Sequence, residues 1–324
     1  MFMLNLLRVI FIMKPRVLFI RSGNKGHHPI TQNQGDSLVE VGCEVFYYDV
    51  VGKGLLGYLR NLPNLRLSVD RINPDIIHSH YSLCGFLASL GFFRKPMVVS
   101  LMGSDVLHSS KLYRFLIRFF ASFAWDLVIY KSEEMQKSLK LKRSVIIPNG
   151  VNPKVFYPLN KRDARLKLGW NQDSKIMLFA SDPRRGEKNY ALFKMAFDKV
   201  KDSGMAVEER CLKNLDKHEM MLYYNAADVL VLTSHHEGSP NVIKEAMFCN
   251  CPFVSVNVGD VHQWMNQTSG NALVSSNSDE LALEVIKVFE SNVVPENTLA
   301  IKEIDAVVIA QKLKLIYEDL ILTR

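Results

Sequence analysis

Short β-rich runs alternate with amphipathic stretches along the chain, and this alternation limits the possible folds most. Strands that alternate with helices are typical of α/β domains with parallel sheets. In the first half we expect strands at Val17–Ile20, Glu44–Tyr48, Asp75–His78, Met97–Leu101, Leu127–Tyr130 and Val145–Ile147, and helices near 30–41, 62–72, 82–92, 110–124 and 132–140. In the second half we expect strands at Ile176–Ala180, Val229–Leu232 and Phe253–Val256, and helices near 189–201, 218–226, 240–249 and 279–291.

The two series of strands are separated by 147–152 (IPNGVN) and a polar stretch that runs to Asp173. Pro-Asn-Gly is a turn sequence, and the composition of the whole stretch predicts a linker. A chain of 324 residues is also long for a single core. We therefore expect two domains, 14–150 and 151–304. Apolar residues recur at helical spacing in 305–322, which predicts a final helix.

Composition and charge narrow the class of protein. Hydrophobic residues at 48% and charged residues at 23% are ordinary for a soluble globular chain. The formal charge of +7 favours acidic partners such as nucleotide phosphates or anionic lipid headgroups. Nucleic acid is disfavoured because the sequence has no long Lys/Arg run and no RNA-binding signature. Five scattered cysteines, including Cys249-x-Cys251, form neither a disulfide framework nor a metal-site spacing, which predicts a reducing, cytoplasmic setting.

The first 13 residues (MFMLNLLRVIFIM) are apolar but fall short of the roughly 20 residues of a membrane span. They lack a basic n-region and a small-residue cleavage site, so a signal peptide is disfavoured. We expect either an upstream start or a small membrane-contacting tag, and favour the upstream start.

Two glutamates eight positions apart, Glu237 and Glu245, flank a turn that opens a helix. Ser239 suits the N-cap and Pro240 the first helical position. The amides of a first helical turn form an anion site. Glu245 lies about one and a half turns into the helix, so the two carboxylates can bond hydroxyls on both sides of a bound phosphate. A phosphate between hydroxyl-bearing groups describes a nucleotide sugar.

A second anion site is predicted in the turn after the first strand of the second half. Arg184, Arg185 and Lys188 lie there, and cations at a strand-to-helix turn are well placed to clamp a diphosphate. Which arginine acts with Lys188 stays open. A solvated basic turn is the alternative.

Three loops of the first half hold further candidates. His78 and His80 share one face of a strand, and His80 lies nearer the strand's end. Asp105 follows another strand at the edge where open α/β sheets bind ligands. The loop 23–29 is not G-x-G-x-x-G, so a nicotinamide dehydrogenase is disfavoured. The sequence contains no Asp-x-Asp, so a metal site of that pattern is unsupported.

The run 227–247 resembles the donor motif E-x7-E of glycosyltransferase family 4, the retaining GT-B enzymes. The segment 147–158 is similar to the family's I-P-N-G-V-D-x-x-x-F-x-P signature. The resemblance implies a GT-B fold of two Rossmann-like domains facing a cleft, an acceptor-side first domain, a donor-binding second domain, and a last helix that packs back on the first. It also implies transfer of a sugar from a nucleotide sugar to an acceptor hydroxyl, with retention and without a metal or other cofactor.

The resemblance also suggests residue roles. Lys188 matches the family's Arg-x4-Lys motif imperfectly, because neither arginine stands at that spacing. Met102 occupies the histidine position of His-Gly-Ser-Asp, which leaves the catalytic detail open. The predicted catalytic residues are Glu237, Asp105 and His80. The predicted donor-binding residues are Arg184, Arg185, Lys188, Gly238, Ser239, Pro240, Asn241, Val242, Glu245 and Gly26.

The expected partners are a nucleotide sugar and a glycan or lipid-linked acceptor, in surface polysaccharide or lipopolysaccharide assembly. Two alternatives remain: a GT-B sugar-nucleotide epimerase, and a non-catalytic relative that only binds nucleotide or a partner. The segment 111–118 adds Lys111, Arg114 and Arg118 to a heavy aromatic content. It is either a partly buried helix with a basic outer face or a helix on an anionic membrane surface.

Overall fold

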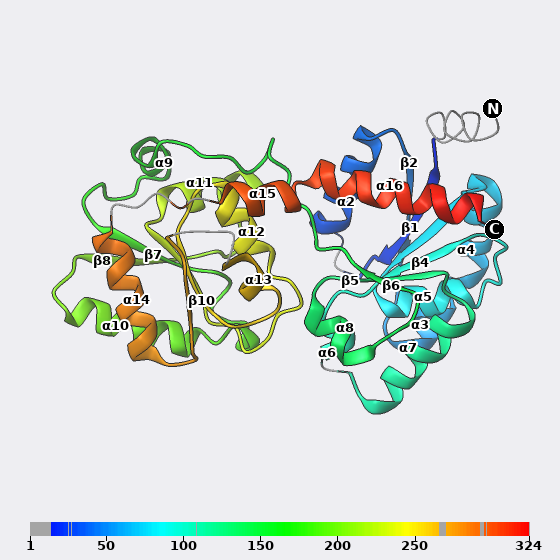
Figure 1. The fold of residues 1–324 in the computed structure, drawn as a ribbon, viewed down its shortest axis with the longest axis horizontal. Coiled ribbons are helices and arrows are strands. Elements are labelled where there is room, and N and C mark those ends of the chain that lie inside the picture. Colours follow the sequence, from blue (N-terminus) through cyan, green and yellow to red (C-terminus); the bar gives the residue numbers. More distant parts are fainter. Residues whose placement is uncertain are drawn as a thin grey trace. The chain divides into compact units, whose positions relative to one another are not determined.

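A computed structural model describes residues 14–24, 26, 28–107, 109–265, 270–291, 295 and 297–323. Residues 1–13, with the two interpretations given above, lie outside the described residues. The chain divides after Gly150 and again after Asp305. The first unit is the chain up to Gly150 together with the segment from Ala306, and the second unit is Val151–Asp305. Each unit is an α/β layer structure around one parallel sheet (Figure 1), so the predicted fold class is confirmed.

The first unit contains six parallel strands in the order β2-β1-β3-β4-β5-β6. The strands are β1 (Arg16–Ser22), β2 (Glu44–Val50), β3 (Ile76–His80), β4 (Met97–Ser100), β5 (Leu127–Tyr130) and β6 (Ser144–Ile146). The helices are α2 (Pro29–Glu40), α3 (Gly54–Leu59), α4 (Leu62–Ile72), α5 (Ser82–Ser89), α6 (Ser104–Leu107), α7 (Lys111–Phe123), α8 (Glu133–Leu139) and α16 (Ala306–Leu322). The strand order reverses between β1 and β3, and ligands bind at such switch points in open α/β sheets.

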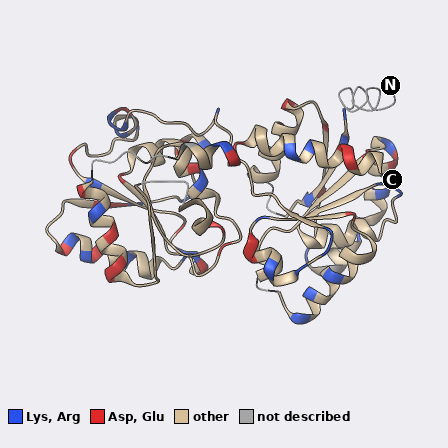
Figure 2. Ribbon diagram, viewed as in Figure 1, with Lys and Arg blue, Asp and Glu red and all other residues tan. Residues whose placement is uncertain are grey.

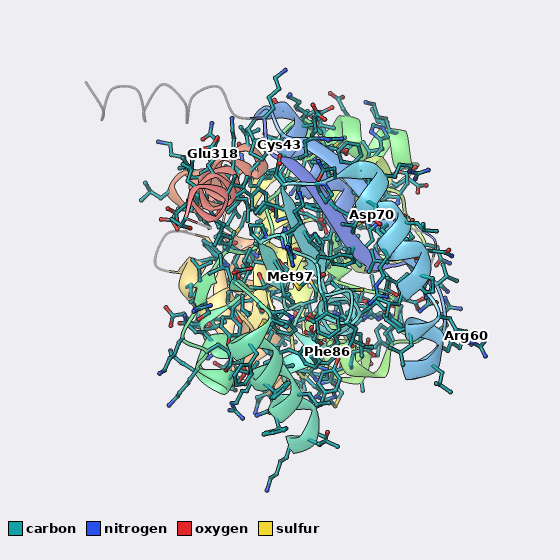
Figure 3. All side chains as sticks on the ribbon, turned by 90° about the vertical axis from the view of Figure 1, so that its right-hand side faces the viewer. Cys43, Arg60, Asp70, Phe86, Met97 and Glu318 are labelled. Atoms are coloured by element: carbon teal, nitrogen blue, oxygen red, sulfur yellow. The ribbon has the colours of Figure 1, made fainter. Side chains whose placement is uncertain are left out.

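Helices cover both faces of this sheet because successive strand residues point to opposite sides. In β1, Val17 and Phe19 pack under α2 and α16, whereas Leu18 and Ile20 pack under the helices of the other face. Figure 3 places Phe86 and Met97 in the interior, while Arg60 lies at the periphery. A strand that is buried on both faces has a continuous run of apolar residues. For this reason the strands predicted from the sequence lie close to the observed ones.

The last helix, α16, packs against α2 within the first unit (Figure 1). The hydroxyl of Tyr317 lies 2.6 Å from Nδ1 of His78 on β3, and Nζ of Lys314 donates to the carbonyl of Val41 at 2.9 Å. Figure 3 shows Glu318 on α16, on the side of the unit where Cys43 lies. The end of the chain therefore completes the covering layer of the first sheet.

The second unit contains five parallel strands in the order β11-β10-β9-β7-β8. The strands are β7 (Lys175–Phe179), β8 (Val207–Cys211), β9 (Val229–Leu232), β10 (Phe253–Val256) and β11 (Ala272–Val274). The helices are α9 (Lys161–Leu168), η1 (Gly186–Lys188), α10 (Tyr190–Asp202), α11 (Lys217–Ala226), α12 (Asn241–Phe248), α13 (Val261–Met265), α14 (Ser278–Glu290) and α15 (Thr298–Ile304). Within the described ranges of both units, no helix has the length and apolarity to cross a membrane.

The linker predicted as far as Asp173 is wrong. Phe156, Ala164 and Trp170 are buried in the core of the second unit, and α9 lies between the first and last of them. The side chain of Asn160 caps α9 by accepting hydrogen bonds from two backbone amides. The stretch is polar because α9 is a surface helix with charged residues on its outer side, and composition alone does not distinguish such a helix from a linker.

Candidate active site

Three loops meet at the carboxyl edge of the second sheet, since β7, β9 and β10 are parallel neighbours. The loop after β7 is joined to the loop after β9 through the hydroxyl of Thr233, which donates to the carbonyls of Lys188 and Asn189, each at 3.0 Å. The amide of His235 donates to the carbonyl of Glu187 at 3.0 Å. These bonds fix the two loops relative to each other and bring their charged side chains together.

Lys188 and Glu237 form an ion pair between these loops. Nζ of Lys188 lies 2.5 Å from Oε1 of Glu237, and the hydroxyl of Ser234 donates to the same oxygen at 2.7 Å. The two side chains are only 13% and 15% exposed, so water screens the pair weakly. The sequence assigned these residues to different parts of one ligand, and the structure brings them into direct contact.

The two arginines of the same turn point to other partners. Arg184 forms a 2.6 Å ion pair with Asp182, and Arg185 forms a 2.7 Å ion pair with Glu187. The guanidinium of Arg184 holds the pKa of Asp182 down at about 2. Both arginines are largely exposed and engaged locally, so the structure places Lys188, but neither arginine, against Glu237.

The predicted N-cap role of Ser239 is wrong. Helix α12 begins at Asn241 with Pro240 at the N-cap, and no side chain caps it. The Ser239 hydroxyl instead donates to Oδ2 of Asp260 at 2.7 Å and accepts from Nζ of Lys244. A buried ammonium requires hydrogen-bonded and charged partners, and this requirement draws Ser239 toward Lys244. The loop before α12 is thereby tied to the loop after β10.

Lys244 and Asp260 are 0% and 1% exposed, with 3.1 Å between Nζ and Oδ2. Gly259 precedes Asp260 in the same loop, with a φ of +59°. A Cβ there would be in tight contact, 3.1 Å from Pro240 and 3.2 Å from the carbonyls of Glu237 and Gly238. The backbone of the predicted donor turn therefore rests directly on the loop after β10. Sequence analysis missed both Asp260 and Lys244, because their pairing joins positions that no short motif connects.

Glu245 lies in the second turn of α12, half-buried. The hydroxyl of Tyr224 on α11 donates to its Oε2 at 2.8 Å. Burial raises the pKa of the Glu245 carboxyl, and the hydrogen bond from Tyr224 opposes this effect. Of the other predicted donor residues, Asn241 opens the helix and Val242 is partly buried against the core.

The first unit has a cavity of about 670 Å³ at the carboxyl ends of β1, β2, β3 and β4. Its walls include Arg21, Tyr58, His80, Met102 and Ser104. It lies at the β1/β3 switch point, where the topology of an open sheet places a ligand site. Both the predicted His80 and Met102 therefore line the same cavity.

His80 and His78 have different surroundings although their rings stack at 4.4 Å. His78 is bonded at both nitrogens, to Tyr317 and to the Ser100 hydroxyl at 2.9 Å, and it holds β3, β4 and α16 together. Nε2 of His80 has no hydrogen-bond partner among the described residues. Burial lowers the pKa of both imidazoles well below the ordinary value, so both are neutral near pH 7. His80 lines the cavity and has one imidazole nitrogen that no described residue uses.

Asp105 holds backbone amides in place, and its predicted catalytic role stays a prediction. It is 2% exposed, and its carboxylate accepts hydrogen bonds from the amides of Ser82 at 3.0 Å, Met102 at 2.9 Å and Gly103 at 3.1 Å. Burial raises the pKa of this carboxyl, while the backbone amides lower it. The side chain fixes the turn that carries Met102 against the cavity.

Tyr81 is a candidate that sequence analysis missed. Its φ of +85° lies in a region that bulky residues rarely adopt, and it also lines the cavity. Such strain is concentrated at functional sites. The residue type of Tyr81 does not predict this backbone conformation. Its position directly after His80 was the one signal in the sequence. Gly26 is exposed with a φ of +68°, and its neighbours Lys25 and His27 lie outside the described residues, so its donor role stays a prediction.

Two family models match this chain, one in each unit. Residues 19–155 match the model described as Glycosyltransferase Family 4, and residues 196–291 match the one described as Glycosyl transferases group 1. The chain belongs to glycosyltransferase family 4.

This family-4 chain is similar in sequence to a known glycosyltransferase. It is 26% identical over 241 residues to TuaC of Bacillus subtilis, whose name describes a teichuronic acid biosynthesis glycosyltransferase, and the match covers 67% of this chain and 61% of TuaC. The chain thus spans less than two thirds of that relative's length.

Two solved structures share the fold at a TM-score of 0.74. Sucrose-phosphate synthase from Thermosynechococcus elongatus is 17% identical, with 95% of this chain and 100% of that chain covered. Anabaena Alr3699/HepE, in complex with UDP and glucose, is 18% identical, with 93% and 99% covered. The predicted GT-B fold is confirmed.

In this family-4 chain, Met102 stands at the histidine position of the family's His-Gly-Ser-Asp segment, as the sequence indicated. Its side chain lines the cavity near Ser104 and His80. A thioether accepts hydrogen bonds weakly and donates none. The polar contacts that a family histidine would make must therefore come from the other walls, among which His80 has an unpartnered nitrogen.

Proposed function

We propose that this family-4 glycosyltransferase moves a sugar from a nucleotide sugar to an acceptor hydroxyl, with retention of anomeric configuration and without a metal cofactor. The Lys188–Glu237 ion pair at the carboxyl edge of the second sheet is the observation that carries the proposal. In this pair a cation suited to a phosphate lies beside a carboxylate suited to sugar hydroxyls, and Glu237 lies in the loop that leads into α12. A helix N-terminus is a suitable place for a diphosphate.

Donor binding exchanges partners within this pair. A diphosphate competes with Glu237 for Lys188, and charge-assisted bonds to phosphate are strong. Glu237 is then released to accept hydrogen bonds from the sugar hydroxyls. Arg184 or Arg185 can join Lys188 by leaving an exposed local ion pair, which costs little.

The nucleoside end of the donor is assigned to Glu245. Tyr224 holds one carboxylate oxygen of Glu245, which orients the other toward a ribose hydroxyl. In the transfer step, the bond between the anomeric carbon and the diphosphate oxygen breaks. A bond from the acceptor oxygen forms on the same face, and the acceptor proton passes to the leaving phosphate. Lys188 and the first-turn amides of α12 stabilise the charge on that phosphate.

The cavity of the first unit is proposed as the acceptor site. The neutral imidazole of His80 can exchange a hydrogen bond with an acceptor hydroxyl, and Tyr81 and Ser104 add polar groups. The acceptor we propose is a glycan or lipid-linked acceptor of surface polysaccharide assembly, met at the cytoplasmic side of a membrane. The name of the relative TuaC, which describes teichuronic acid biosynthesis, supports the polysaccharide part of this proposal. Lipopolysaccharide assembly is the alternative setting.

Incubation with labelled nucleotide sugars, with and without a cell-envelope extract, tests the proposal. Acceptor-dependent release of nucleoside diphosphate is expected, and it should persist in a metal chelator. The anomeric configuration of the product, read by NMR, tests retention. Epimerised sugar nucleotide without transfer would establish the epimerase alternative. Tight nucleotide binding without turnover on any donor would establish the non-catalytic alternative, which the loss of the family histidine at Met102 favours.

A further inference from the structure

Helix α7 exposes an apolar stripe. Leu112, Phe115, Phe119 and Phe123 are 69%, 60%, 48% and 79% exposed, and their spacing places them on one side of the helix. The opposite side is anchored in the core through Ile117 and Ala121. Single exposed apolar residues are normal, but a row of four including three phenylalanines marks an interaction surface.

Cations line one edge of this stripe. Lys111, Arg114 and Arg118 project between the buried side and the exposed stripe, and α7 contains no acidic residue. Figure 2 shows Lys and Arg, and no Asp or Glu, along α7. An exposed aromatic face with a cationic edge is typical of helices that lie in a membrane interface.

A cationic cavity of about 400 Å³ adjoins the same edge. It lies between α7 and the connection from α8 to β6, and its cations are Arg118, Lys140, Lys142 and Arg143. In the described parts of the chain, none of these four side chains lies within ion-pair distance of a carboxylate. Arg118 lines the cavity and also lies on the cationic edge of α7 beside the stripe. The cavity and the stripe are therefore neighbours on one surface.

We infer that the stripe and the cavity form one docking surface for an anionic membrane, with a lipid headgroup phosphate in the cavity and the phenylalanines at the acyl boundary. The charges favour a membrane over a second copy of this chain, because two such surfaces face to face would bring eight cavity cations together. The assignment does not depend on sugar transfer, and donor hydrolysis in solution should not require it.

Co-sedimentation of the full chain with vesicles tests the cavity. The vesicles contain equal parts phosphatidylglycerol and phosphatidylcholine, and phosphatidylcholine alone serves as the neutral control. Replacing Lys140, Lys142 and Arg143 with Gln should lower partitioning about 100-fold at low salt, since each cation near an anionic leaflet contributes about five-fold. Added salt should weaken binding of the wild type.

A matched control removes the same charge from the second unit. Arg162, Lys167 and Lys201 are exposed there and form no ion pair among the described residues, so their Gln variant has the same net charge. It should bind vesicles within about two-fold of the wild type. Equal loss in both variants would mean that net charge alone drives binding, and the inference would fail. Wild-type protein that stays in solution with anionic vesicles would overturn it as well.

The stripe is tested with Phe115, Phe119 and Phe123 changed to Ser, which should reduce partitioning at least ten-fold without changing donor hydrolysis. Because these side chains are exposed, the variant should fold, and its circular dichroism checks this. The competing occupant of the stripe is a second copy of this chain, and the oligomeric state of the protein without vesicles tests for it. A wild-type dimer that the Ser variant converts to a monomer would assign the stripe to self-association and overturn the membrane surface.

Discussion

The two units share one architecture but differ in the state of the polar residues at the carboxyl edges of their sheets. In the second unit, charges from three loops are paired with one another, as in Lys188–Glu237 and Lys244–Asp260. In the first unit, the corresponding edge encloses a cavity in which His80 has an unpartnered nitrogen and Tyr81 a strained backbone.

This difference has a physical meaning. Paired charges hold the loops of the proposed donor site in place before any ligand arrives, so little ordering would remain to be done if a diphosphate binds there. The first unit holds its turn with the buried carboxylate of Asp105 and leaves the cavity walls free. We therefore expect changes in the second unit to affect stability and donor use together, and changes around the cavity to affect the acceptor.

The largest effect is expected at the buried pair beneath the donor turn. Lys244→Met leaves Asp260 buried without its cation, which should lower the free energy of unfolding by about 3–5 kcal/mol. Denaturant unfolding followed by fluorescence measures it, because Trp264 is close to Lys244.

A double variant makes this test specific. Adding Asp260→Asn to Lys244→Met removes the lone charge and should recover a large part of the lost stability. A single variant that loses less than about 1 kcal/mol would show that the pair contributes little, and the contrast between the units would weaken.

The next effect concerns turnover. Glu237→Ala should reduce kcat/KM on the order of 10–100-fold while the protein stays folded, because a directed charged contact to the sugar is lost. Release of nucleoside diphosphate measures it, and Glu187→Ala, in the neighbouring loop, is the control. Turnover within a factor of about three of the wild type would remove Glu237 from the proposed role.

A smaller effect is expected for donor affinity. Lys188→Ala should weaken binding of a nucleoside diphosphate about ten-fold and leave the nucleoside almost unchanged, because only the phosphates contact the ammonium. Isothermal titration with both ligands measures the difference. Lys167→Ala, which removes an exposed cation of α9 in the same unit, should change either affinity at most about two-fold. Equal weakening of both ligands by Lys188→Ala would indicate a distorted site.

The sequence predicted the fold well where burial determines residue type. The strands Leu127–Tyr130, Val229–Leu232 and Phe253–Val256 were located to the residue, because central parallel strands are apolar on both faces. The sequence missed β8 and β11, which are the two edges of the second sheet. An edge strand such as VEERC in β8 carries polar residues and gives no apolar run.

The candidate site was predictable in its motifs but not in its contacts. The spacing of Glu237 and Glu245 and the basic turn at Lys188 pointed to the donor edge. The distant partners of Ser239 and Asp105 did not follow from the sequence, because they come from other loops. Asp260 is 21 positions from Ser239, and Ser82 is 23 positions from Asp105. Side-chain hydrogen bonds of this kind depend on tertiary packing, which a local pattern does not encode.

The last prediction is an acid sensitivity of the first unit. Burial keeps the pKa of His78 and His80 far below the value near 6.5 of an unfolded chain, so below that pH the unfolded state binds protons that the folded state does not. The histidines therefore contribute stability that is fully present above about pH 6.5 and is lost as the pH falls below that value. Hydrogen exchange of the β3 amides measures the loss locally, and His80→Gln should remove about half of it. Exchange of β9, whose unit buries no histidine among its described residues, is the internal reference. Equal acid sensitivity of β3 and β9 would show that the two sheets do not differ in the way proposed.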